Sequence, residues 1–310
     1  MGIRQEQRPA DARPHGAALA IAVTAVAAAA AVSMLAACSA APSSSRASLK
    51  PRTSGIGNVS DPQRSNPAWL LTRSALSQLI ADPAVRDELR GSQIYEILQP
   101  GQQPLAGVTA EPVVTFASAT ALEDAISSGQ LPAGTFGVLY DPEAWPFTPV
   151  TEQRDPVLAA TRAAAVAHAH DLRLIVAPAL NLTTVLTPGS REPRWRQFLN
   201  LKLAGRLAEV ADLVELQAQS LERDTATYTA FIRAATRQAS AANPRIRLLA
   251  GLSTNPPGAP VDSQHLTAAI QATRFMVDGY WLNIPGQGGR CPTCNARRPD
   301  IAIQTLQALH

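Results

Sequence analysis

The sequence predicts an α/β protein in which residues 68–310 form a closed (β/α)-barrel. Short apolar segments alternate with helical segments along this body, and parallel strands need long crossovers, which are usually helices. The body is also close to the roughly 250 residues typical of one such barrel. Closure is favoured because an open, doubly wound sheet, which is the alternative, would leave two edges to protect.

Seven segments have the length and apolar character of buried strands. They span residues 94–98, 113–117, 136–140, 172–177, 213–218, 246–252 and 279–284. A standard barrel has one strand more, and the proline-rich link 100–112 is too short for a helix. We therefore expect a barrel that is incomplete or irregular at its seam.

Capping residues mark the helices between these segments. Residues 69–80 have helical apolar spacing and predict the first helix, and the second begins at Asp82-Pro83 and ends at Gly91. The later starts carry the same kind of signal: Thr120 with Glu123, Asp155 with Pro156, Asp224, and Asp262. A further helix is expected over residues 195–210.

The N-terminus has the layout of a secretory signal peptide. Arginines at positions 4, 8 and 13 precede an alanine-rich apolar stretch, residues 17–37. The stretch closes on Leu35-Ala36-Ala37-Cys38, which resembles the lipobox of bacterial lipoproteins. This resemblance implies that residues 1–37 are removed, that Cys38 carries acyl chains, and that the protein is anchored to the cell membrane on its extracytoplasmic side. A single transmembrane helix is the alternative, because the stretch approaches the roughly 20 residues that span a bilayer.

Residues 38–67 are rich in Ser, Pro and Arg and hold almost no large apolar side chain. Such a composition cannot offset the entropy cost of ordering, so it predicts a flexible tether between membrane and barrel.

The charges of the whole chain argue against a nucleic-acid partner. With 27 Lys and Arg against 24 Asp and Glu, and no basic cluster interleaved with aromatic residues, we expect no nucleic-acid binding.

Polar side chains gather at the predicted strand ends that meet at one mouth of a barrel. Asp141 and Glu143 follow segment 136–140, and Glu215, Gln217 and Gln219 alternate with apolar neighbours in and after 213–218. This period of two directs the polar face into the lumen, where buried groups need partners. The other candidate ligand-binding residues share this placement: Glu96, Trp145, Asn181, Asn255, Trp281 and Asn283.

Four stretches of the body carry a resemblance to a known family. They are residues 139–156, 172–182, 249–258 and 279–294. In them the chain resembles a family of exported actinobacterial lipoproteins with a TIM-barrel domain similar to glycoside hydrolases. The resemblance implies the fold and, more loosely, a carbohydrate partner.

Glycoside hydrolysis needs one protonated and one ionised carboxyl group, about 5 Å apart for retention or roughly 6.5–9.5 Å for inversion. Asp141 or Glu143 could form such a pair with Glu215, and Trp145, Phe147 and Trp281 could stack on sugar rings. The chain departs from common barrel glycosidases, which place acids at the strand ends where it has Asn181 and Asn283, and it has no DxxDxDxE run of the chitinase type.

Two alternatives stand beside hydrolysis. Asp141 could simply cap the turn after its strand, and the mouth could bind a glycan or an envelope partner without catalysis. A serine hydrolase is disfavoured because Ser253 lies in an incomplete nucleophile-elbow pattern, with no histidine following at a suitable position.

Cys291 and Cys294 form a CxxC pair in a glycine-rich segment. No second ligand pair for zinc lies nearby, and the segment does not open a helix as a thioredoxin motif would. In an oxidising exterior we expect a local disulfide. We predict neither a metal nor another cofactor.

Overall fold

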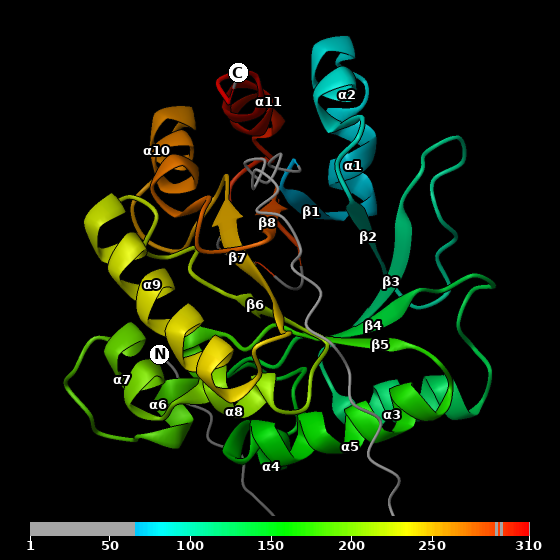
Figure 1. Cartoon of the computed structure of the whole chain (residues 1–310), viewed down its shortest axis with the longest axis vertical. Coiled ribbons are helices and arrows are strands. Elements are labelled where there is room, and N and C mark those ends of the chain that lie inside the picture. The colour runs from blue at the N-terminus through cyan, green and yellow to red at the C-terminus, as the bar shows by residue number, and fades with distance from the viewer. Residues whose placement is uncertain (1–65, 289–290, 292–293, 310) are drawn as a thin grey trace, which may run out of the picture. The chain divides into compact units, whose positions relative to one another are not determined.

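The computed structural model describes residues 66–288, 291 and 294–309. The predicted signal peptide, Cys38 and nearly all of the tether lie outside the described residues. Eight parallel strands form a closed barrel in which each strand pairs with its neighbours in chain order, and β8 pairs with β1 (Figure 1). The predicted (β/α)-barrel is thereby confirmed.

The eight strands all run the same way around the barrel. They are β1 (Ala68–Thr72), β2 (Ile94–Leu98), β3 (Glu111–Phe116), β4 (Gly137–Tyr140), β5 (Arg173–Val176), β6 (Leu213–Leu216), β7 (Arg247–Ser253) and β8 (Gly279–Asn283).

Helices follow every strand except β2 and lie outside the strand ring in Figure 1. They are α1 (Arg73–Leu79), α2 (Pro83–Leu89), α3 (Ala119–Ser127), α4 (Val150–Arg154), α5 (Pro156–Ala169), the 3₁₀ helix η1 (Leu180–Leu182), α6 (Thr183–Leu186), α7 (Arg194–Asn200), α8 (Leu203–Ala208), α9 (Thr225–Ala242), α10 (Ser263–Thr273) and α11 (Pro299–Gln307). Of the helices in the described part of the chain, none has the length and apolar character to cross a bilayer.

The strand β1 corrects the predicted helix over residues 69–80. Trp69, Leu70 and Leu71 are buried in succession because both faces of β1 are covered, and a continuous apolar run does not distinguish such a strand from a helix. The helix begins only at Arg73, where the Thr72 side chain caps α1 by accepting from the Ala75 N–H. The barrel is therefore complete and the expected incompleteness was wrong, whereas the predicted absence of a helix from the link 100–112 is confirmed.

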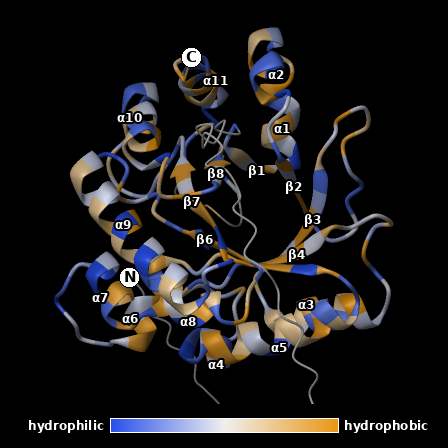
Figure 2. Ribbon diagram, in the orientation of Figure 1, coloured by the Kyte–Doolittle hydropathy of each residue, from blue (hydrophilic) through white to orange (hydrophobic). Residues whose placement is uncertain are grey.

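Two apolar layers follow the alternation of side chains along the strands. Val214 and Leu216 of β6 belong to the large layer between strands and helices, whereas Leu213 belongs to a smaller cluster inside the barrel. Strands β4, β6 and β7 are correspondingly hydrophobic in Figure 2. This register also decides which way Glu215 points, because it shares the face of Leu213.

The seam between β8 and β1 is packed backbone against backbone. Gly279 pairs with Ala68, and a methyl group added at Gly279 would overlap the Ala68 main chain. Only glycine allows the two strands to approach this closely at the point where the barrel closes.

We expect Gly279→Ala to lower the free energy of unfolding by about 1–3 kcal/mol, because backbone atoms cannot move aside as a flexible side chain could. Urea unfolding followed by circular dichroism measures the change. The matched control is Gly288→Ala, whose added methyl group would meet nothing closer than 4.0 Å. Equal stability of the two variants would contradict this account of the seam.

Candidate active site

The candidate site lies at the carboxyl ends of β4, β5 and β6. Asp141 and Glu143 directly follow β4, Asn181 lies in η1 after β5, and Gln217 follows β6. Because neighbouring parallel strands end at the same rim, segments far apart in sequence meet there.

An amide holds each of the two carboxylates after β4. The Gln217 Nε2 donates to Oδ1 of Asp141 at 2.6 Å and to the Ala177 carbonyl at 2.9 Å, which bridges the ends of β4, β5 and β6. The Asn181 Nδ2 donates to Oε2 of Glu143 at 3.2 Å, and Oδ1 of Asn181 accepts from the Ala144 N–H at 2.9 Å. These bonds fix where both carboxylates point.

Glu215 projects into the lumen and has no solvent-exposed surface. Among the described residues, neither of its carboxyl oxygens has a hydrogen-bond partner. Burial raises the pKa of Glu215 well above its ordinary value, and the negative charges of Asp141 and Glu143 raise it further. Its surroundings therefore favour the uncharged form of Glu215, beside two carboxylates.

The glycine of β7 makes room for Glu215. A Cβ built at Gly251 would lie 2.5 Å from Oε1 of Glu215 and 2.6 Å from the amide nitrogen of Gln219. The Gly251 carbonyl accepts from the hydroxyl of the buried Tyr228 at 3.1 Å. A larger residue at position 251 would displace either the carboxyl group or the amide.

Two aromatic side chains follow Asp141 and Glu143 in the segment after β4. The Trp145 ring meets Phe147 edge-on with 5.1 Å between ring centroids, and the Trp145 indole N–H donates to the Thr148 hydroxyl at 2.9 Å. Phe147 is 49% exposed, so its ring is open to a ligand from solvent. In the lumen, the Trp281 indole N–H is buried without a partner among the described residues.

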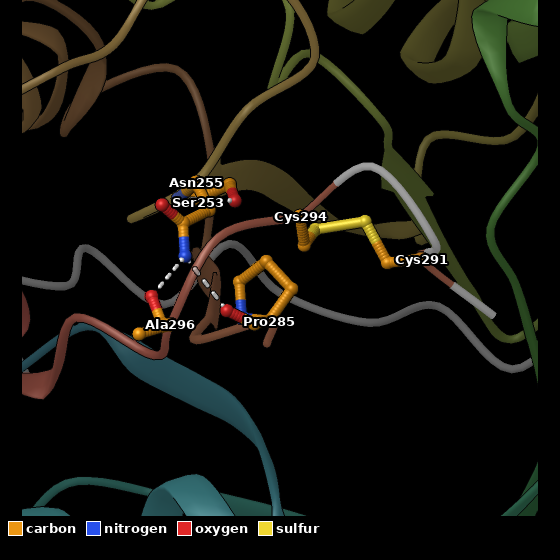
Figure 3. Close-up of a disulfide and its surroundings, with 6 residues drawn as sticks. All are labelled: Ser253, Asn255, Pro285, Cys291, Cys294 and Ala296. Carbon is orange, nitrogen blue, oxygen red and sulfur yellow. Dashed lines mark hydrogen bonds between the residues drawn. A yellow bond between two sulfur atoms is a disulfide. The ribbon is translucent and has the colours of Figure 1, made fainter. Parts of the chain in front are cut away.

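Three other residues named from the sequence stand apart from this group. Glu96 is buried on the helix-facing side of β2, where its carboxylate accepts from the Leu105 N–H at 3.0 Å and orders the β2–β3 loop. Asn255 donates to the Pro285 and Ala296 carbonyls at 2.9 and 3.0 Å (Figure 3). Asn283, at the end of β8, accepts from the Thr254 N–H through its backbone carbonyl.

Cys291 and Cys294 are joined by a disulfide in the segment between β8 and α11 (Figure 3). Asn255 contacts the two ends of the same segment, through Pro285 and Ala296. The disulfide therefore lies within a loop that is already attached to the end of β7.

Two buried carboxyl groups were missed from the sequence. Glu222, between β6 and α9, is wholly buried, and its Oε2 accepts from the Ser253 N–H at 3.0 Å. Burial raises the pKa of Glu222 well above its ordinary value. Its position in a loop ahead of a helix cap gave no sign of burial.

Glu152 of α4, the other missed carboxyl group, has a structural role. Its oxygens accept from the Ala119 and Thr120 N–H groups, the Ser118 and Thr120 hydroxyls, and the Tyr140 hydroxyl, at 2.7–3.2 Å. It thus caps the start of α3, where orphan N–H groups and the helix dipole favour an anion. Glu152 is therefore a structural carboxylate, held by these donors. Glu215 has none of these donors, so its carboxyl group is available for proton transfer.

Within the described residues, no three His, Cys, Asp or Glu side chains gather as a metal site. The carboxyl group at Glu215 and the amide-held Asp141 and Glu143 are suited instead to proton transfer and to stabilising positive charge.

No protein-family model and no curated protein match this chain. Among solved structures, a chitinase from Chromobacterium violaceum is 12% identical, with 78% of this chain and 99% of that chain covered and a TM-score of 0.42. The spore cortex-lytic enzyme SleL of Bacillus megaterium is 11% identical, over 80% of this chain and 74% of its own, with a TM-score of 0.44. Triosephosphate isomerase from Bartonella henselae is 16% identical, over 70% and 92%, with a TM-score of 0.39. Likenesses this distant carry no conclusion about ligand or reaction.

Replacing Glu215 by Gln should change how stability depends on pH. The folded-state pKa of Glu215 is raised, so its contribution to the free energy of unfolding is complete below the unfolded value and is lost as pH rises toward the folded value. The loss is about 1.4 kcal/mol per pH unit in that window. We expect the free energy of unfolding of Glu215→Gln, relative to wild type, to increase by this slope as pH rises above the ordinary glutamate pKa of about 4.3, as urea titrations would measure. Glu209→Gln, at an exposed position, should show a constant difference, and a constant difference for Glu215→Gln as well would show that Glu215 is ionised in the folded protein.

Proposed function

We propose that this protein is a lipid-anchored extracytoplasmic glycoside hydrolase that uses Glu215 as its proton donor. The observation that carries the proposal is the neutral, buried Glu215 beside the two amide-held carboxylates of Asp141 and Glu143. One protonated and one ionised carboxyl group are what hydrolysis of a glycosidic bond requires.

In this reaction Glu215 gives its proton to the glycosidic oxygen as the bond from that oxygen to the anomeric carbon breaks. The leaving sugar departs as an alcohol, and positive charge develops at the anomeric carbon. Asp141 or Glu143 stabilises that charge, either by bonding to the carbon or by taking a proton from the attacking water. Water supplies the hydroxyl group of the product; when a carboxylate bonds to the carbon, the proton of this water returns to Glu215, and when a carboxylate acts as the base, that carboxylate keeps the proton and exchange with solvent restores both groups.

The surroundings of the carboxylates support a carbohydrate ligand. Trp145 and the half-exposed Phe147 follow Glu143 in the segment after β4, and sugar rings pack their apolar faces on such aromatic groups. The partner is therefore proposed to be a glycan, with no cofactor required.

A non-catalytic glycan- or envelope-binding lipoprotein is the second candidate. The complete burial of Glu215 favours it, because a general acid must reach the oxygen that it protonates. The hydrolase proposal thus requires the mouth to open above Glu215 when substrate binds.

A panel of nitrophenyl glycosides and cell-envelope polysaccharides separates the two functions. For a substrate that the wild type cleaves, we expect kcat to fall about 10²–10⁴-fold in Glu215→Gln, and strongly in one of Asp141→Asn and Glu143→Gln. The matched control, Glu209→Gln, should retain wild-type activity. Cleavage that survives in Glu215→Gln would contradict the assigned acid, and glycan binding without cleavage by the wild type would favour the binding protein.

The proposed anchor has its own test. We expect wild-type protein from a bacterial host that processes lipoproteins to partition into the detergent phase of Triton X-114, and Cys38→Ser to partition into the aqueous phase, because Cys38 supplies the attachment point for acyl chains. Mass spectrometry of the mature N-terminus would identify the lipid. Detergent partitioning of Cys38→Ser would instead favour an uncleaved transmembrane segment.

A further inference from the structure

Glu215 has no route to solvent in the closed structure, so the group that covers it decides whether a ligand can reach it. Gln217 and Gln219 follow Glu215 along the chain, beyond the end of β6 and nearer the mouth. Of these two glutamines, one is fixed and one is not.

Gln217 is fixed by its two hydrogen bonds to Asp141 and to the Ala177 carbonyl. Moving it would break both bonds and release a carboxylate that the proposed reaction needs. Gln217 is therefore a positioning residue for Asp141.

Gln219 is different on each count. Among the described residues, its side-chain amide makes no hydrogen bond to a protein group, and the residue is partly exposed to solvent. A Cβ built at Gly251 would nonetheless lie 2.6 Å from the amide nitrogen of Gln219 and 2.5 Å from Oε1 of Glu215. The two side chains therefore border the same small space above Gly251. The Gln219 side chain thus packs beside the buried acid and also reaches solvent.

We propose that Gln219 is the side-chain gate of the site: it covers Glu215 in the free protein and turns away to admit the ligand. Rotation of this side chain costs little because no hydrogen bond within the described chain holds it, whereas Gln217 and Gly251 are held in place. Once turned, its amide can donate to a ligand hydroxyl group or accept from one. The proposal rests on the proposed function, but its test does not depend on activity.

The test measures access to Glu215 directly, with dicyclohexylcarbodiimide as the probe. This uncharged reagent reacts with protonated carboxyl groups in apolar surroundings, and peptide mass spectrometry locates and quantifies the adduct. We expect Gln219→Gly and Gln219→Ala to label at Glu215 several-fold faster than wild type, because the cover is removed. Gln219→Met, which keeps the length of the side chain without the amide, should stay near the wild-type rate.

Two controls distinguish a gate from general loosening of the fold. Glu222 is a second buried carboxyl group with a raised pKa, so it also suits the reagent. Its labelling rate in the same samples should not change, because the proposed gate covers Glu215 only. Gln264→Ala, at an exposed position on α10, should leave both rates unchanged. Unchanged labelling of Glu215 in Gln219→Gly, or equal acceleration at Glu215 and Glu222, would overturn the gate. If no glycoside in the panel were cleaved, the hydrolase proposal would fail, but the labelling rates would still test the gate. Failure of the proposed function can therefore be told apart from failure of the gate.

Discussion

Closure of the parallel sheet between β8 and β1 is the constraint on which the rest of the structure depends. It requires the backbones at Gly279 and Ala68 to pack directly on one another, and it removes the last two edges of the sheet. A closed ring encloses a lumen filled by side chains, and a carboxyl group buried there loses its hydration. The raised pKa of Glu215 is therefore first a consequence of burial by the fold as a whole, to which Asp141 and Glu143 add.

The site is organised by how its carboxyl groups are satisfied. Asp141 and Glu143 each receive an amide hydrogen bond, and Glu152 receives several donors at the start of α3. Glu215 receives none from the described chain and borders two negative charges. Similar side chains within one region thus acquire different chemistry from the number and kind of donors around them.

Much of the fold and part of the site could be predicted from the sequence. The alternation around Glu215 gave its direction into the lumen, because a period of two on a buried strand leaves one choice once the apolar face is assigned. The strand β1 was mistaken for a helix because its apolar residues are buried on both faces and so carry no period.

Contacts between distant segments could not be predicted. Gln217 and Asp141 are 76 residues apart in sequence, and only the order of strands brings them together. The burial of Glu222, and the space that Gly251 leaves beside Glu215, depend on side-chain packing, which local patterns do not record.

The isolation of Glu215 from solvent has a consequence for turnover. In the proposed reaction, an acid that has given up its proton must recover one, and because Glu215 has no exposed surface the water that supplies this proton would enter through the same opening that admits substrate. Product release and reprotonation of Glu215 would then require the same opening motion, and that motion would limit the rate of the proposed catalytic cycle.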